Sequence, residues 1–316
     1  MSLLDRLQRK LFYSRPFRNL IAWGQRIVLP GFEGFSVYAV SRLFVKALAD
    51  GHLVTRASAI SFKLFIAFFP AVLVLLTLIP FIPIEDFQTK MMLNLRNTMP
   101  LEVYKFIEST LTDLLVKKHS TLLSISFLVG IYLASNSMDA ILEGFSQSTH
   151  LHTWHSPLKQ RLLSLGLIVG ISIMVLLAVI ILTVSDTVIL WAQGQGLIGD
   201  DLTLVGIHVA KYAISLLLIM GSISLLYNAG DPLTRRFRFF TPGAIVATFL
   251  FVLVAQGLAF VFSHFTDYNA LYGSIGAILA VQLWLYFNML ALLFGYELNT
   301  SILRARLGRS KELRVH

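Results

Sequence analysis

The chain has 316 residues, of which 56% are hydrophobic and 14% charged, with a formal net charge of +9. Soluble domains carry about 25% charged residues, so this composition and a mean hydropathy of +0.74 exclude a soluble globular protein and indicate an integral membrane protein. The sequence contains no cysteine, which excludes disulfides, thiolate metal sites and cysteine nucleophiles. The surplus of Lys and Arg is expected to face anionic lipid at the membrane surface rather than nucleic acid.

Residues 1–56 are predicted to form a basic cytoplasmic segment with amphipathic helices. It has no apolar run followed by a cleavage site, so we do not expect a signal peptide. Apolar residues recur at helical spacing in two places: Leu3, Leu4, Leu7 and Leu11, and then Val40, Leu43, Phe44, Ala47 and Leu48. Basic amphipathic helices commonly lie in the plane of the membrane interface, and we expect both to do so.

Six segments reach the roughly 20 apolar residues that a membrane-spanning helix needs. They lie at about 57–82, 120–142, 161–191, 204–229, 242–264 and 272–302. None of them alternates as a barrel strand would. The prediction is therefore an all-α, polytopic bundle of six transmembrane helices over 57–303. An amphipathic outer loop at 84–119 lies at the interface or packs on the bundle, and a basic tail follows at 304–316.

The distribution of Lys and Arg predicts the orientation. Nine basic residues precede the first span, and further ones lie in 159–161, 235–238 and 304–314. The short loops on the other side, "AQGQGLIGDDL" and "HFTDYNA", contain none. Because basic loops stay in the cytoplasm, both termini are expected there. The long first outer loop is basic as well, but long loops weigh less in this rule.

Patterns that resemble catalytic or cofactor motifs are better explained by their context. The sequence "GQGLIG" at 194–199 fits a dinucleotide motif, but it follows a membrane span instead of a strand. His150, His152 and His155 offer imidazoles for a metal, yet no carboxylate completes the set nearby, so a solvated loop is favoured. We expect no enzymatic activity, no cofactor and no metal.

Ionisable residues inside spans are more informative, because charge in the hydrocarbon is costly and usually functional. Counting about 1.5 Å of rise per residue separates them into layers. The cytoplasmic-leaflet cluster is Lys63, Asp139, Glu143 and Glu297. The outer-leaflet cluster is Asp186, His208, Lys211, His264 and Asp267, and only the neutral Gln256, Gln282 and Asn288 lie near the midplane.

Two interpretations of these layers stay open. In the structural one, charged groups snorkel or pair at helix ends, with Lys63 paired to Asp139, Glu143 or Glu297 and Lys211 paired to Asp186. In the functional one, they form a polar path that meets a charged headgroup at each leaflet. The midplane holds no carboxylate, which argues against an ion pump.

Two spans contain features that affect packing. Pro70 lies within the first span, where it removes a backbone hydrogen bond and is expected to kink the helix. In the last span, small residues and Asn288 share one sector, so we expect close helix packing and a hydrogen bond from Asn288 across a helix interface. Gln282 and Glu297 point to a different face.

Three stretches resemble the YihY/virulence factor BrkB family of bacterial inner-membrane proteins. They are "ASAISFKLFIAFFPAVLVLL", "HTWHSPLKQRLLSLGLIV" and "DYNALYGSIGAILAVQLWLYFNMLALLFGYELN", within a similarity from about 35 to 303. The family-like positions are Ala57, Ala59, Pro70, Trp154, Pro157, Arg161, Tyr268, Asn269, Tyr272, Gly273, Ser274, Gly276, Trp284, Glu297 and Asn299. The sequence departs from the family at Lys63 and in "YNAGDPLTRR".

The resemblance implies six spans with cytoplasmic termini and little defined chemistry. Family members once carried a ribonuclease label, and others are linked to serum resistance or to export of lipid or lipopolysaccharide precursors. We therefore expect a transporter of lipids or lipid-linked envelope precursors, with anionic phospholipid or a lipopolysaccharide precursor as partner. The alternatives are a non-transporting scaffold or regulator and, third, a ribonuclease. Nucleic acid is not an expected partner, and a homo-oligomer stays open.

Overall fold

The computed structural model describes residues 22–50, 52–81, 92, 112–113, 119–149, 157–195, 201–230, 237–264 and 274–312. All regular structure in these ranges is helical, which confirms the predicted fold class. The helices with defined bounds are α3 (Val37–Asp50), α4 (Leu53–Leu78), the 3-10 turn η1 (Ile79–Phe81), α7 (Ser120–Thr149), α8 (Pro157–Gly194), α9 (Asp201–Gly230), α10 (Pro242–His264) and α12 (Ser274–Glu312). The predicted amphipathic segments near Leu3 and at 84–119 fall mostly outside the described residues.

Six of the described helices, α4, α7, α8, α9, α10 and α12, are long and apolar enough to cross a membrane. Each contains one of the predicted spans nearly whole, and most extend beyond it. α7 continues seven residues past 142, and α12 continues through the start of the tail predicted at 304. Hydropathy marks only the apolar part of a helix, whereas backbone hydrogen bonding continues into the polar interface.

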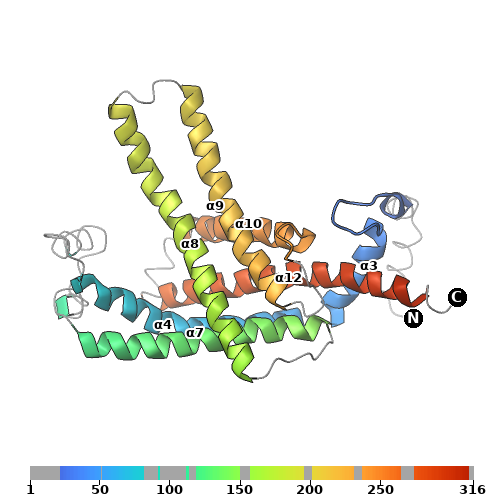
Figure 1. Ribbon diagram of the computed structural model, residues 1–316, viewed down its shortest axis with the longest axis horizontal. Helices are drawn as coiled ribbons and strands as arrows, with labels where there is room; N and C mark the ends of the chain where they lie inside the picture. The colour runs from blue at the N-terminus through green and yellow to red at the C-terminus, as the bar shows by residue number, and fades with distance from the viewer. Residues whose placement is uncertain are drawn as a thin grey trace.

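The spanning helices are arranged around α12. It packs against α4, α7 and α10, and α4 also packs along α7. α8 and α9 pair with each other as a hairpin that contacts α7 and α10, and α9 also forms hydrogen bonds with α12. Figure 1 shows this hairpin running steeply across α4, α7 and α12 and projecting away from them.

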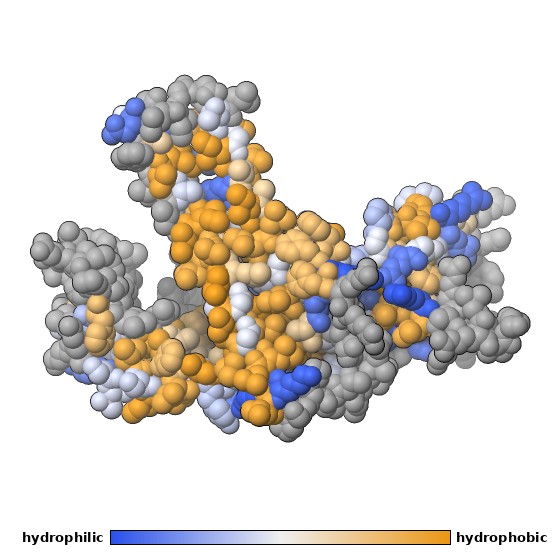
Figure 2. Space-filling model, viewed as in Figure 1, coloured by the Kyte–Doolittle hydropathy of each residue, from blue (hydrophilic) through white to orange (hydrophobic). Residues whose placement is uncertain are grey.

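The outer surface of these helices is largely apolar. Figure 2 shows hydrophobic residues covering the α8–α9 hairpin and the middle of the molecule, with hydrophilic residues gathered towards the ends. Along α8, Val169, Ile173 and Leu176 are all exposed. Exposing an apolar surface of this extent to water is unfavourable, whereas lipid chains are as apolar as these side chains and can cover it.

α10 crosses α12 at a pair of glycines. A Cβ on Gly243 would overlap the backbone oxygen of Gly295, and a Cβ on Gly295 would overlap the backbone oxygen of Gly243. Asn299 strengthens this crossing, because its Oδ1 accepts a 2.8 Å hydrogen bond from the Gly243 N–H at the start of α10. Small residues thus bring the two backbones into direct contact, as the small-residue sector of the last span predicts.

An aromatic cluster joins α7, α9 and α12 near the same end of the molecule. Phe145 stacks on Tyr296 with ring centroids 4.1 Å apart, and Tyr227 packs edge-on against both. The Tyr227 hydroxyl donates to Leu292 O at 2.6 Å, and the Tyr296 hydroxyl donates to Gly230 O at 2.7 Å. The hydroxyls are therefore satisfied while the rings fill the core.

The amphipathic face predicted for α3 packs on α12. Val40 and Ala47 are buried, and Phe44 meets Phe294 edge-on at 4.8 Å. The basic residues Arg42 and Lys46 are exposed. α3 is therefore joined to the bundle on one side and presents positive charge on the other.

Pro70 lies inside α4, which stays helical across it. Its side chain faces α7, where a Cβ on Gly130 would lie 3.6 Å from Pro70 Cβ. Pro70 therefore contributes to the α4–α7 contact, while the kink itself stays a prediction.

Candidate functional site

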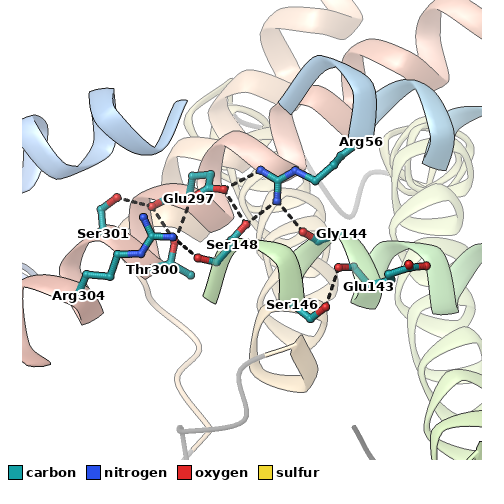
Figure 3. Close-up of polar contacts among 9 residues, drawn as sticks. All are labelled: Arg56, Glu143, Gly144, Ser146, Ser148, Glu297, Thr300, Ser301 and Arg304. Carbon is teal, nitrogen blue, oxygen red and sulfur yellow. Dashed lines mark hydrogen bonds and ion pairs between the residues drawn. The ribbon is translucent and has the colours of Figure 1, made fainter. Parts of the chain in front are cut away.

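A buried ion pair fastens α4 to α12. Arg56 Nη2 lies 2.7 Å from Glu297 Oε1, and the two side chains are 6% and 1% exposed. Arg56 also reaches α7, because its Nη1 donates to Gly144 O and to Ser148 Oγ, each at 2.7 Å. Ser148 Oγ in turn donates to Glu297 Oε1 at 2.6 Å. Figure 3 shows Arg56, Ser148 and Glu297 pointing towards one another from three helices.

The cytoplasmic ends of α7 and α12 (by the predicted orientation) are tied by further hydrogen bonds around this pair. Arg304 donates to Ser148 O in the last turn of α7, where a helix leaves carbonyls without internal partners. Thr300 Oγ1 lies 3.3 Å from Glu297 Oε2. We call Arg56, Ser148, Glu297 and Arg304 the clasp. Arg56, Ser148 and Glu297 are buried and Arg304 is half-buried, so we interpret the clasp as a structural lock.

A second ion pair joins α7 to α8 and is open. Arg161 Nη1 lies 2.8 Å from Asp139 Oδ2, and the side chains are 35% and 27% exposed. The same nitrogen donates to Ser135 Oγ at 3.0 Å and to Asn136 Oδ1 at 2.8 Å. Ser164 Oγ donates to Asp139 Oδ1.

An aromatic ring completes this group. The guanidinium carbon of Arg161 lies 5.3 Å from the centroid of the Tyr132 ring, within the range of a cation–π contact. We call Tyr132, Ser135, Asn136, Asp139, Arg161 and Ser164 the α7–α8 polar site. It combines a fixed positive group, a carboxylate and an exposed aromatic side chain.

The pairing predicted for Lys63 is wrong for two of its three proposed partners. Asp139 pairs with Arg161 and Glu297 pairs with Arg56, while Lys63 is exposed on α4. Glu143 is also exposed, and Figure 3 shows its carboxylate pointing away from the clasp. The predicted cytoplasmic-leaflet cluster thus divides into two separate ion pairs and two exposed side chains.

Neither arginine was identified from the sequence as the partner of a carboxylate, because each lies at a span boundary, where basic residues ordinarily indicate orientation. Arg56 was assigned to the N-terminal segment, and Arg161 was named only as a positive-inside residue and a family-like position. A signal was available for both, since a carboxylate within a span needs a cationic partner. Arginine supplies more hydrogen-bond donors than lysine for that purpose.

The outer-leaflet residues are only partly described. Lys211 is buried on α9, with its Nζ 5.4 Å from the centroid of the Tyr212 ring. His208 is exposed, and its Nδ1 lies 2.8 Å from Leu204 O. The side chains of Asp186 and His264, and all of Asp267, lie outside the described residues. The Lys211–Asp186 pair therefore stays a prediction.

The neutral residues near the midplane do not form one group. Gln256 is exposed on α10. Asn288 donates to Trp284 O at 2.7 Å within its own helix, so the predicted bond across a helix interface is wrong. It is wrong because the preceding turn of α12 offers a carbonyl at the right distance. Gln282 Nε2 lies 3.3 Å from Ser61 Oγ on α4, and its Oε1 is buried without a hydrogen-bond partner among the described residues.

Among the described residues, no three His, Asp or Glu side chains lie close enough to hold a metal ion together. His150, His152 and His155 lie outside the described residues.

Comparison with known proteins places the chain in a family. The family model described as "Virulence factor BrkB" matches residues 44–315. The chain belongs to the virulence factor BrkB family. Like other bacterial BrkB-family proteins named as membrane proteins, it is a multi-pass integral membrane protein.

Two relatives show how far the similarity extends. The chain is 26% identical over 245 residues to "Putative ribonuclease-like protein YfkH" of Bacillus subtilis, which covers 78% of this chain and 88% of the relative. It is 28% identical over 204 residues to "UPF0761 membrane protein" of Tolumonas auensis, covering 63% of each. No solved structure matches this BrkB-family chain. The relatives thus support family and membrane location, and they assign no chemistry to the α7–α8 polar site.

Proposed function

We propose that this protein moves a lipid or a lipid-linked envelope precursor between the leaflets of the bacterial inner membrane. The observation that supports this proposal is the α7–α8 polar site. Its ion pair is about one-third exposed on helices whose outer surfaces are largely apolar. Charged groups in contact with lipid are costly and are usually retained for function.

The contrast between the two ion pairs supports the same conclusion. The Arg56–Glu297 pair of the clasp is buried, as a structural ion pair is expected to be. The α7–α8 polar site has the same types of charged groups, but these remain accessible from outside the helices. An accessible cation beside an apolar surface suits an amphiphile, whose headgroup needs a polar partner and whose chains need an apolar one.

Transport is testable with the purified protein in liposomes that contain a phospholipid with a fluorescent headgroup label. Quenching the outer leaflet with dithionite reports how fast label from the inner leaflet becomes accessible. We expect transbilayer movement several times faster than in protein-free vesicles of the same composition. Equal rates in the two preparations, with protein incorporation verified, would contradict the proposal.

The orientation is proposed together with the function, with both termini in the cytoplasm. Because the chain has no cysteine, single cysteines report accessibility without background. A membrane-impermeant maleimide added to intact spheroplasts should label Gln195→Cys, beyond the end of α8, and should not label Ser310→Cys near the end of α12. The reverse pattern would overturn the orientation.

Two alternatives account for fewer of these observations. A scaffold would use the exposed Arg42 and Lys46 of α3 to hold anionic lipid, but it gives no role to the α7–α8 polar site. A nuclease is suggested by the name of the Bacillus relative, yet RNA cleavage needs positioned acids, bases or a metal. We propose that the chain is not an enzyme, since the described ion pairs are arranged for binding and packing.

A further inference from the structure

The guanidinium of Arg161 is held by only one of its three nitrogens. Its hydrogen bonds to Ser135, Asn136 and Asp139 all come from Nη1. Nε and Nη2 donate to none of the described residues, and the side chain is partly exposed. The three contacts fix the plane of the group and leave its opposite edge open.

That open edge has the geometry of an oxyanion site. The Nε–H and one Nη2–H of an arginine point in parallel, and together they bind two oxygens of a phosphate or carboxylate. Because Ser135, Asn136 and Asp139 already hold the guanidinium, little side-chain entropy remains to be lost when a ligand binds. Asp139 also accepts a hydrogen bond from Ser164, so its carboxylate keeps a second partner when Arg161 binds a ligand.

The surroundings of the edge favour a lipid over a soluble anion. Arg161 is the fifth residue of α8, about 6 Å along the helix from Pro157, and it lies within the apolar span Leu158–Leu182. Tyr132 beside it is exposed, as is Leu128 one helical turn away on α7. Leu158, one turn before Arg161 on α8, is exposed as well. The edge thus offers a cationic group to a headgroup beside exposed apolar side chains that can contact its acyl chains.

We propose that the Nε–Nη2 edge of Arg161 binds the phosphate of a membrane lipid headgroup. Tyr132 lies against the headgroup, and the acyl chains lie along the exposed apolar side chains of α7 and α8. The inference rests on the proposed function for its substrate class, and it adds the site and the recognised group. Arg161 is thus a binding residue, and Asp139 is a positioning residue that orients it.

The test is equilibrium binding of a short-chain phosphatidylglycerol, labelled on one acyl chain, to the purified full chain in detergent micelles. Charge-assisted hydrogen bonds predict that Arg161→Gln weakens binding about tenfold or more. Arg161→Lys should also weaken it, since the charge remains but the fork is lost. Lys159→Gln removes the same charge from an exposed position two residues away, and it should leave binding unchanged.

Asp139→Asn separates binding from a purely structural role. It keeps a side-chain oxygen that can accept the hydrogen bond from Arg161, so it should weaken binding less than Arg161→Gln does. If Asp139→Asn and Arg161→Gln weaken binding equally, the pair is structural and the inference fails. Size-exclusion chromatography of each variant verifies folding, and Arg161→Lys keeps the inference testable if Arg161→Gln does not fold.

Two competitors identify the recognised group. A diacylglycerol with the same chains lacks the phosphate and should compete poorly, whereas equal competition would overturn phosphate recognition. Inorganic phosphate should not displace the lipid, and full displacement would assign the site to a soluble anion.

Failure of this inference differs from failure of the proposed function. Wild-type protein that moves lipid while Arg161→Gln binds normally refutes only the site, and wild-type protein that binds through Arg161 without moving lipid refutes only transport.

Discussion

Replacing Arg56 by Ala should lower the free energy of unfolding by about 3–5 kcal/mol. The substitution would leave the Glu297 carboxylate charged in a position that is 1% exposed, without its cationic partner. It would also remove the contacts of Arg56 to Gly144 and Ser148 on α7. Equilibrium unfolding in mixed detergent micelles, followed by far-ultraviolet circular dichroism, measures the loss.

Arg42→Ala is the matched control, because Arg42 is exposed on α3 and forms no ion pair with any described residue. It should change stability by no more than about 0.5 kcal/mol. The double variant Arg56→Met/Glu297→Leu removes both charges and leaves neither one buried alone. It should therefore be less destabilised than a variant in which only Arg56 or only Glu297 is replaced. A loss for Arg56→Ala no larger than that for Arg42→Ala would show that the clasp is not a structural lock.

Gly295→Ala should destabilise the protein by about 3 kcal/mol or more, at the upper end for an overpacked core. The new methyl group would meet the backbone of Gly243 and would lie 2.5 Å from the Tyr227 hydroxyl. Backbone cannot move aside as a flexible side chain can, so α10 and α12 would have to separate. The same micelle unfolding experiment measures the effect.

Gly257→Ala provides the control within α10. A Cβ at Gly257 meets nothing within 4 Å, and alanine is the better helix former by about 1 kcal/mol. This variant should therefore be neutral or slightly stabilised. If Gly295→Ala behaves like Gly257→Ala, the close crossing of α10 and α12 is not present in the folded protein.

Hydropathy predicted the spans well because the membrane imposes a simple condition, that about 20 consecutive residues be apolar. α10 has the predicted bounds, since both of its ends coincide with polar loops. α12 extends to Glu312 because its basic end contains no proline, and Gly308 lowers helix stability by only about 1 kcal/mol. The sequence also predicted that small residues in the last span allow close packing, which Gly295 confirms.

Partners in the candidate site could not be predicted in the same way. The pair Arg56–Glu297 joins two helices that are distant in the chain. The pair Arg161–Asp139 joins two helices that meet at a steep angle (Figure 1). Residue depth was the only basis for choosing Lys63 as the partner of the carboxylates. Depth does not indicate which face of α4 contacts the neighbouring helices. For Asn288, the position on a packed sector suggested a hydrogen-bond acceptor on a neighbouring helix. The acceptor instead belongs to its own helix.

The rate of transbilayer lipid movement in proteoliposomes tests the central claim most directly, with wild-type protein, Arg161→Gln and Lys159→Gln compared in vesicles that contain labelled phosphatidylglycerol. We predict fast movement for wild type and Lys159→Gln, and movement close to the protein-free rate for Arg161→Gln. Wild-type protein that is folded and incorporated, yet moves lipid no faster than empty vesicles do, would contradict the account.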